Sequence, residues 1–239
     1  RFRRLAMLFR QEGLPVTLYR GMEVFSTPEL PRLLDEERLL TLGGSRYLLV
    51  EFAFGETPWF AAQTLESIAV RGLTPVVAHP ERYYFIQDDP RRLLRWAESG
   101  YVLQLNRGSL SGMFGRHAAK AAQWCLANGC VHLFASDAHS PYRRTPQLDD
   151  LFDHIARAAS PEAAALLLER NILLFQLRHR GGGVLAPAEA DGHDARGRLA
   201  ELCVDFFQAR LLGVDGFDAA AGLLVMLLTR LCKTRLRAL

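Results

Sequence analysis

The chain of 239 residues is 49% hydrophobic and 23% charged and carries a formal net charge of +3. This is the composition of an ordinary globular protein, and the small net charge gives no indication of a nucleic-acid partner or of an anionic membrane surface. The length allows one sizeable α/β domain, alone or with a smaller appendage. The cysteines contain no C-x-x-C pair and fit reduced thiols in a cytoplasmic protein better than a disulfide framework: Cys125, Cys130, Cys203 and Cys232.

Short apolar runs alternate along the chain with segments of helical periodicity. The runs are rich in β-branched or aromatic residues and predict strands at 16–19, 47–54, 74–79, 101–106, 131–136 and 172–175. Segments with apolar residues at i, i+3 and i+4 predict helices at 58–71, 90–99, 115–128 and 147–169, the last broken near Ser160 and Pro161. Strand–helix alternation of this kind predicts a parallel sheet, either open or closed into a barrel.

Capping residues agree with these helix boundaries. Asp89 before Pro90 is typical of an N-cap followed by a proline in the first turn. Gly72, Gly100 and Gly129 stand where the first three helices should end.

The composition changes after residue 178, so we expect the α/β domain to occupy residues 1–178. Residues 179–197 are rich in glycine, alanine, proline and acidic residues, which is typical of a linker. Residues 198–239 predict a helical extension. Its most apolar stretch, FDAAAGLLVMLLTRL, spans about 15 residues and is short for a bilayer span. We therefore expect a helical hairpin packed on the domain or on a second subunit, and no membrane insertion.

Residues with metal-ligating side chains lie at the ends of several predicted strands. Glu51 lies in the run LLVEF, His79 ends the third run, and Asp137 and His139 follow the fifth; Glu23 follows the first run. Because the carboxyl ends of parallel strands meet at one edge of a sheet, we expect these side chains to lie together. Imidazole nitrogens and carboxylate oxygens suit zinc, manganese or iron. Two such ions would clamp a phosphoryl group.

Each of these residues also has a more ordinary interpretation. Glu51 could point outward or pair with an arginine, and His79 could be a turn residue. Asp137, after a serine, could cap a helix. Their joint occurrence at the strand ends of one alternating chain favours the metal site.

Arginines follow these residues closely. Arg82 lies three residues after His79, and Arg143 and Arg144 lie just after His139. On loops above the same edge of the sheet they would offer planar donors to a phosphate. The alternative is a set of exposed loop arginines without a ligand, but their placement favours anion binding.

Five segments of the chain form an ordered string of motifs: RGMEV, LLVEFAF, PVVAHPERY, LQLNRGSLSGMFG and FASDAHSPYRRTP. In order and spacing they resemble the bacterial PHP-domain tyrosine phosphatases of capsule and exopolysaccharide clusters, the CpsB/YwqE-type family. The likeness covers residues 5–176. The PHP superfamily also includes histidinol phosphatases and polymerase-associated nucleases, but HPERY and the pattern Q-x-N-x-x-S-x-x-G-x-x-G resemble the tyrosine-phosphatase branch.

The resemblance implies a PHP-type distorted (β/α)7 barrel with a centre of two or three divalent ions, usually manganese (Mn2+). It implies a cytoplasmic hydrolase whose substrate is phosphotyrosine, especially in the tail of a bacterial tyrosine autokinase that controls polysaccharide synthesis and export. The implied partner is that kinase tail, and the sequence leaves open whether the chain also forms an oligomer.

The metal ligands carry over by motif. Glu51 resembles the bridging carboxylate, and His79, Asp137 and His139 resemble further ligands. Glu23 matches the family's G-x-E position, either as a metal ligand or as a residue that contacts a metal ligand.

The arginines and the pocket motif carry over in the same way. Arg82 and Arg144 resemble the arginines that hold the phosphate. Gln104, Asn106 and Ser109 match a motif on the side of the pocket whose role the resemblance leaves unassigned.

Two segments that the resemblance implies have no counterpart. Family members carry an H-x-H strand and a later TPHH-like segment that supply metal ligands, and neither occurs in these 239 residues. We therefore expect an N-terminally incomplete fragment of a longer reading frame, the alternative being a degenerate family member. Two other functions stay open: a PHP phosphoesterase acting on a small phosphate such as histidinol phosphate, and a non-catalytic remnant that acts as a binding module.

Overall fold

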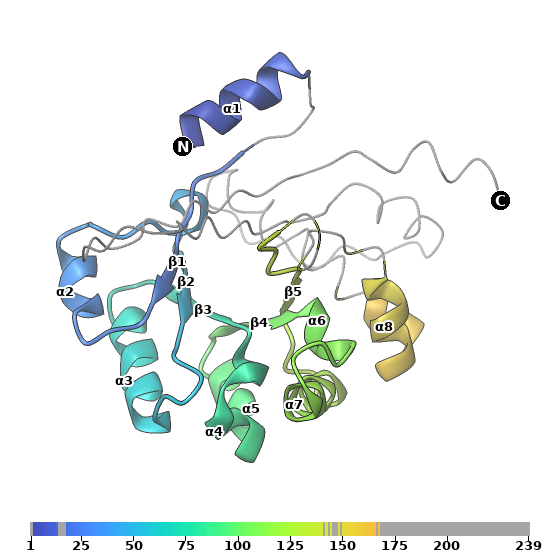
Figure 1. Cartoon of the computed structure of the whole chain (residues 1–239). Coiled ribbons are helices and arrows are strands. Elements are labelled where there is room, and N and C mark those ends of the chain that lie inside the picture. Colours follow the sequence, from blue (N-terminus) through green and yellow to red (C-terminus); the bar gives the residue numbers. More distant parts are fainter. Residues whose placement is uncertain are drawn as a thin grey trace, which may run out of the picture.

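The computed structural model describes residues 2–13, 18–140, 142, 144, 148, 150–165 and 167. Figure 1 shows these residues as a sheet flanked by helices, with one further helix above it. The predicted strand at 172–175, the linker at 179–197 and the helical extension at 198–239 lie outside the described residues, so these predictions stay untested.

Parallel strands form one five-stranded sheet in the order β1-β2-β3-β4-β5. Their bounds are β1 Glu23–Phe25, β2 Tyr47–Glu51, β3 Thr74–Ala78, β4 Val102–Asn106 and β5 Leu133–Ala135. The register places Leu49 opposite both Glu23 and Val76. This sheet confirms an α/β protein with a parallel sheet, whereas the closed (β/α)7 barrel stays a prediction.

Helical segments fill most of the connections between strands. Their bounds are α1 Phe2–Gln11, α2 Leu30–Asp35, η1 Leu42–Gly44, α3 Pro58–Ala69, η2 Pro80–Arg82, α4 Tyr84–Asp88, α5 Arg91–Glu98, α6 Arg107–Leu110, α7 Arg116–Ala127 and α8 Leu151–Ala158, where η marks a 3-10 helix. Because strand order follows chain order, each crossover runs in the same direction, which places the crossover helices on one face of the sheet. Figure 1 shows α3, α5 and α7 along that face.

The strand predictions are confirmed for β2 to β5, with shorter bounds, and wrong for the first strand. Leu18 and Tyr19 lie in no strand, and β1 instead begins at Glu23. β1 is three residues long and only Val24 in it is buried, so it carries no periodicity that a sequence pattern could reveal.

The helix ends follow the predicted capping residues in most places. Gly72, Gly100 and Gly129 have φ values of 77°, 82° and 67°, a left-handed conformation that favours glycine and ends the preceding helix. α8 ends at Ala158, so the predicted break before Pro161 is confirmed.

Helix α5 begins within one residue of the predicted position. Asp89 has non-helical φ and ψ of −140° and 84°, whereas Pro90 already has helical values of −67° and −13°. The Asp89 carboxylate accepts a hydrogen bond from the backbone N–H of Arg91, and one from Nε of Arg91 at 2.7 Å. Asp89 therefore binds the first turn of the helix, as the sequence predicted.

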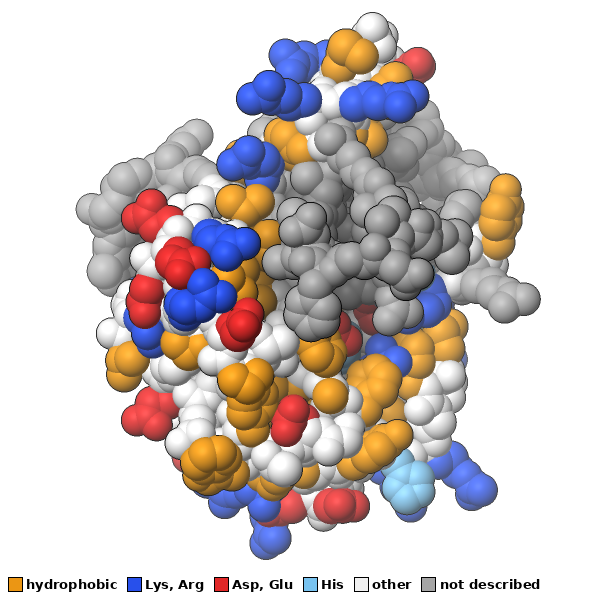
Figure 2. Space-filling view, turned by 60° about the vertical axis from the view of Figure 1, so that its left-hand side comes forward, with side chains coloured by type: hydrophobic (Ala, Val, Ile, Leu, Met, Phe, Trp, Pro, Cys, Tyr) orange, Lys and Arg blue, Asp and Glu red, His pale blue; other side chains and the backbone are white. Residues whose placement is uncertain are grey.

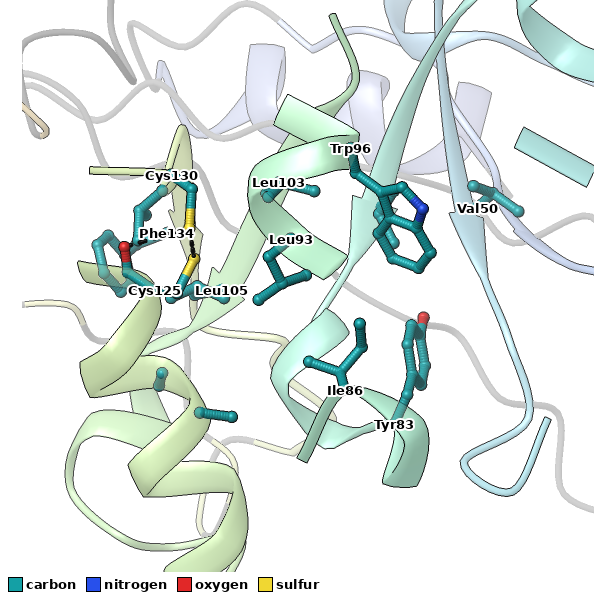
Figure 3. Packing of buried hydrophobic residues seen from close by; sticks show 14 of the residues in the cluster. Val50, Tyr83, Ile86, Leu93, Trp96, Leu103, Leu105, Cys125, Cys130 and Phe134 are labelled. Carbon is teal, nitrogen blue, oxygen red and sulfur yellow. Dashed lines mark hydrogen bonds between the residues drawn. The ribbon is translucent and has the colours of Figure 1, made fainter. Parts of the chain in front are cut away.

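The two faces of the sheet pack against different hydrophobic clusters. Figure 3 shows part of the larger cluster, in which Leu103 and Leu105 of β4 lie near Leu93 of α5. The smaller cluster lies on the opposite face: Leu42, Tyr47, Leu49, Val76, Ala78, Val102, Leu133 and Ala135. Since side chains alternate along a strand, Glu51 shares this second face with Leu49.

Two of the cysteines lie in the larger cluster. Cys125 in α7 and Cys130 just before β5 are free and buried, with their sulfur atoms 2.8 Å apart (Figure 3). This agrees with the prediction of reduced thiols for this pair. Cys203 and Cys232 lie outside the described residues.

Helix α1 was not predicted from the sequence and has no buried residue. Its Met7 and Leu8 side chains are 50% and 42% exposed. Figure 2 shows basic and hydrophobic side chains together on this helix, at the top of the view. In the part of the chain that the structure describes, no helix is long and apolar enough to cross a membrane.

Candidate metal and phosphate site

Three of the predicted ligands lie together beside the carboxyl ends of β2 and β3. Glu23 begins β1, Glu51 ends β2 and His79 follows β3. Nε2 of His79 lies 3.3 Å from Oε1 of Glu51 and 3.6 Å from Oε1 of Glu23. One ligand atom of each residue lies within 4.8 Å of the other two. We call Glu23, Glu51 and His79 the acidic cluster.

His79 is held in an unusual conformation. Its backbone is left-handed, with φ 34° and ψ 52°, which is uncommon for a residue other than glycine. The side chain is buried, and the rings of Phe54 and Tyr83 lie edge-on to it. Strained backbone of this kind concentrates at functional sites. His79 is therefore a turn residue, but one whose turn directs the imidazole at two carboxylates.

The surroundings of His79 favour a positive charge on the ring. Burial alone would lower the pKa of His79, but hydrogen bonding to Glu23 and Glu51 and the charge of Asp137 outweigh it and raise the pKa to about 10. Without a bound cation the imidazole is protonated at neutral pH. A divalent ion bound at Nε2 would replace that proton.

Arg82 and Arg144 converge on Asp137. Oδ2 of Asp137 lies 3.5 Å from Nη1 of Arg82 and accepts a close hydrogen bond from Nη2 of Arg144. Residues 136–140 are not helical, so the helix-cap interpretation of Asp137 is wrong. We call Arg82, Arg144 and Asp137 the arginine cluster.

Aromatic rings hold the guanidinium of Arg82 in place. Its Cζ lies 4.4 Å from the ring centroid of Phe54 and 4.3 Å from that of Phe114. Arg144 lies over the same Phe114 ring at 5.3 Å. Burial lowers the pKa of Arg82, but a guanidinium remains charged at neutral pH. A contact with a ring face uses no N–H group of the guanidinium, so it does not compete with a phosphate for these donors.

His139 presents Nε2 as an acceptor. Its Nδ1 lies 2.8 Å from the carbonyl oxygen of Asp137, which can only accept, so Nδ1 carries the proton. Nε2 lies 3.5 Å from Nη1 of Arg144. A histidine that donates from one nitrogen to a carbonyl and offers the other nitrogen has the arrangement of a metal ligand.

The structure brings together three of the five predicted ligands. Among the residues that it describes, the cluster with metal-ligand spacing contains neither Asp137 nor His139. Asp137 instead pairs with Arg82 and Arg144, and His139 lies beside Asp137. Arg143 lies outside the described residues.

The pocket motif is buried throughout, and one of its residues contacts the arginine cluster. Nδ2 of Asn106 donates to Oδ2 of Asp137 at 2.8 Å. Ser109 Oγ donates to Glu81 Oε1 at 2.5 Å. Gln104, in the middle of β4, is 3% exposed.

Sequence reasoning missed three residues of the site: Glu81, Phe54 and Phe114. Glu81 is fully buried, and burial raises the pKa of its carboxyl group despite hydrogen bonds that lower it. In the sequence it stands beside an arginine in a proline-containing turn, where an exposed side chain is the usual expectation. Phe54 and Phe114 stand in the motif segments LLVEFAF and LQLNRGSLSGMFG. No other feature of the sequence marked them as residues of the site.

The donor set of the acidic cluster fits a divalent cation. Two carboxylates face a buried imidazole, an arrangement that requires added positive charge, supplied by a proton or by a metal ion. Oxygen and imidazole donors of this kind suit manganese, zinc and iron. The residues present therefore fit a divalent cation.

Together the fold and the site define an α/β protein with a candidate cation site beside an arginine-lined anion site. A family profile described as capsular polysaccharide synthesis, CpsB/CapC, matches residues 1–173. The chain belongs to this family, as the five motifs of the sequence predicted.

Similar proteins carry names that agree with this family. The tyrosine-protein phosphatase YwqE of Bacillus subtilis (strain 168) is 30% identical over 166 residues, which cover 70% of this chain and 65% of that protein. The tyrosine-protein phosphatase CpsB of Streptococcus pneumoniae is 30% identical over 165 residues, which cover 66% of this chain and 68% of that protein. The chain thus spans about two thirds of the length of these curated relatives.

A solved structure is also similar. It is described as that of YwqE from Bacillus subtilis and CpsB from Streptococcus pneumoniae, unique metal-dependent tyrosine phosphatases. The TM-score is 0.66 at 28% sequence identity, and the match covers 79% of this chain and 75% of the other.

Proposed function

We propose that this chain carries catalytic residues of a metal-dependent protein-tyrosine phosphatase. The substrate is phosphotyrosine on a bacterial tyrosine autokinase of capsule or exopolysaccharide synthesis, in the cytoplasm. The single observation that carries the proposal is the pairing of the acidic cluster, which suits a cation, with the arginine cluster, which suits a phosphate. The names of the two relatives support the same activity.

The proposed ligands are the residues that the motifs indicated. Glu23, Glu51 and His79 hold a first divalent ion, and Asp137 and His139 contribute to a centre of two or three ions. Mn2+ is the ion that we expect. When bound, such ions activate water and neutralise charge on a phosphoryl oxygen.

The arginine cluster binds the phosphoryl group. Arg82 and Arg144 present planar donors that match two phosphoryl oxygens. In the free chain Asp137 occupies both guanidinium groups, so an entering phosphate competes with one carboxylate for two cations. Fixed positive charge beside the phosphoryl oxygens stabilises the charge that develops on them in the transition state.

The aromatic rings beside Arg82 favour an aryl phosphate. Phe54 and Phe114 flank the guanidinium, and the Phe54 side chain is 36% exposed. An aromatic ring packs well against such groups, whereas a small polar phosphate ester has nothing to place there. A phenolate leaving group has a pKa of about 10 and departs without strong acid assistance.

Turnover measured with and without Mn2+ tests the proposal. We would determine the metal content of the purified chain, then its turnover of p-nitrophenyl phosphate, a phosphotyrosine peptide and histidinol phosphate, with YwqE assayed in parallel. We expect Mn2+-dependent turnover and a preference for the phosphotyrosine peptide. Preference for histidinol phosphate would contradict the tyrosine-phosphatase assignment. Little bound metal and no turnover would instead support a binding module.

A further inference from the structure

A fully buried carboxylate joins two segments of the site. Glu81 lies in η2, two residues after His79, and is 0% exposed. Its Oε1 accepts hydrogen bonds from Oγ of Ser109 at 2.5 Å and from the backbone N–H of Asn106 at 3.1 Å. Nε2 of Gln87 donates to the Glu81 carbonyl oxygen at 3.1 Å and so fixes its backbone. The turn after β3 is thereby tied to the end of β4.

The burial of the Glu81 carboxyl group needs a reason beyond packing. Taking a carboxyl group out of water is costly unless hydrogen bonds replace the lost hydration. Oε1 has two donors, whereas Oε2 has no hydrogen-bond partner in the described part of the chain. An apolar side chain would avoid this cost. What the carboxyl group adds is the direction of its two hydrogen bonds.

Asn106 is the residue that these hydrogen bonds orient. It is 0% exposed, and its backbone N–H is bound by Glu81. Its side chain binds a different residue: Nδ2 donates to Oδ2 of Asp137 at 2.8 Å. Asn106 therefore links the two carboxylates: its backbone binds Glu81 and its side chain binds Asp137.

Asp137 is a residue that requires such support. Its φ of 50° lies in the left-handed region, which is strained for a residue other than glycine. Arg82 and Arg144 attract the same Oδ2 atom that Asn106 binds. Holding Oδ2 in this way leaves Oδ1, which lies 3.5 Å from Nδ1 of His139, for a cation.

We propose that Glu81 and Asn106 are positioning residues. Glu81 orients Asn106, and Asn106 holds Asp137 so that one carboxylate oxygen serves the arginine cluster and the other serves a divalent ion. This inference rests on the proposed function and gives the pocket motif the role that the resemblance left unassigned.

A double-mutant cycle on Mn2+ affinity tests the proposal. We would titrate Mn2+ calorimetrically, without substrate, into the wild-type chain, Glu81→Ala, Asn106→Ala and the double variant. Loss of a residue that orients a metal ligand costs about 10- to 100-fold in metal affinity. We expect that loss in Asn106→Ala, and no further loss in the double variant, because Glu81 acts through Asn106. Unchanged affinity in Asn106→Ala, or losses that multiply in the double variant, would overturn the proposal.

Matched variants separate positioning from general damage to the fold. Ser111→Ala removes a hydroxyl that donates to the Gly108 carbonyl in the same segment but does not contact Glu81, so Mn2+ affinity should not change. Glu81→Gln keeps an acceptor oxygen and should retain most of the Mn2+ affinity. A loss as large as that of Glu81→Ala would contradict the acceptor role. If the alanine variants do not fold, Ser109→Ala removes one of the two bonds to Glu81, and unchanged Mn2+ affinity there would overturn the proposal.

Metal binding without substrate also separates this proposal from the proposed function. A wild-type chain that binds Mn2+ and gives the expected cycle, but does not turn over a phosphotyrosine peptide, contradicts the phosphatase assignment alone. A chain with turnover but without the expected cycle contradicts the positioning roles alone.

Discussion

The acidic cluster and the arginine cluster balance charge in opposite ways. In the acidic cluster two carboxylates face one imidazole, whereas in the arginine cluster two guanidinium groups face one carboxylate. The first cluster requires added positive charge for balance and the second requires added negative charge. The site is thus divided into a cation side and an anion side, which is the division that a metal-bound phosphate ester requires.

The two clusters also differ in the backbone that carries them. Glu23 and Glu51 stand on paired strands of the sheet. Arg82 lies in a 3-10 helix, and Arg144 itself lies in a bend. The sheet therefore fixes the two carboxylates of the cation side, while side-chain contacts with aromatic rings and with Asp137 fix the anion side.

The largest expected effect comes from removing the imidazole of the cation side. His79→Ala should abolish Mn2+-dependent turnover, with a loss of more than about 100-fold. Removing a metal ligand costs more than removing a residue that orients a ligand. Turnover of p-nitrophenyl phosphate and bound Mn2+ would be measured, with circular dichroism to check folding. Asp137→Ala should act in the same way. Activity that survives both changes would remove these residues from the metal centre.

A change on the anion side should spare metal binding. Arg82→Ala should lower kcat/KM by roughly 100- to 1,000-fold, as for loss of a charge-stabilising donor, while Mn2+ affinity changes little. Arg71 pairs with Asp35 away from the site, so Arg71→Ala is the matched control and should leave kcat/KM unchanged. A parallel loss of Mn2+ affinity in Arg82→Ala would break the distinction between the two sides.

The raised pKa of His79 predicts how stability depends on pH. Its folded-state pKa of about 10 lies above the ordinary value of 6.5, so the stability it contributes is complete below pH 6.5 and is lost as the pH rises through 10. The Tm of the metal-free chain should fall between these pH values. The increase in Tm on adding Mn2+ should grow over the same interval, because metal replaces the proton. Scanning fluorimetry would measure both effects. If the Tm of His79→Gln falls with rising pH as much as that of the wild-type chain, groups other than His79 cause the fall.

The smallest expected effect concerns the aromatic support of the anion side. A Cβ at Gly108 would lie 2.8 Å from the Phe114 ring and displace it from Arg82. Gly108→Ala should lower kcat/KM for aryl phosphates by about two- to fivefold, the equivalent of one exposed cation–π contact. A Cβ at Gly55 would lie at an ordinary distance of 3.8 Å from Tyr84, so Gly55→Ala is the control. Equal effects of the two changes would argue against a role of Phe114.

The sequence predicted the central strands and the residues at their ends because both depend on local patterns. Apolar runs bounded by polar residues identified β2 to β5, and Glu51 and His79 followed from the rule that strand ends meet at one edge. Glu23 was anticipated because it follows the first apolar run and matches a motif, but its own strand is too short to show periodicity and was not predicted.

What could not be predicted depends on contacts between distant segments. The left-handed backbone of His79 and Asp137 is maintained by tertiary packing, and nothing in their local sequence requires it. The ion pairs of Arg82 and Arg144 with Asp137 likewise join residues that only the folded chain brings together. Glu81 was missed because a charged residue in a turn is expected to be exposed, whereas its carboxyl group is fully buried.

The strand order has a consequence for how the site is laid out along the chain. Glu23, Glu51, His79, Asn106 and Asp137 follow one another at intervals of 28, 28, 27 and 31 residues, each about one strand–helix unit. Every unit delivers one functional group to the common edge. Residues inserted at the opposite edge, between a helix and the next strand, would lengthen an interval without moving that group. The site is therefore modular, and during synthesis it gains its members one unit at a time, with Asp137 the last of these five to leave the ribosome.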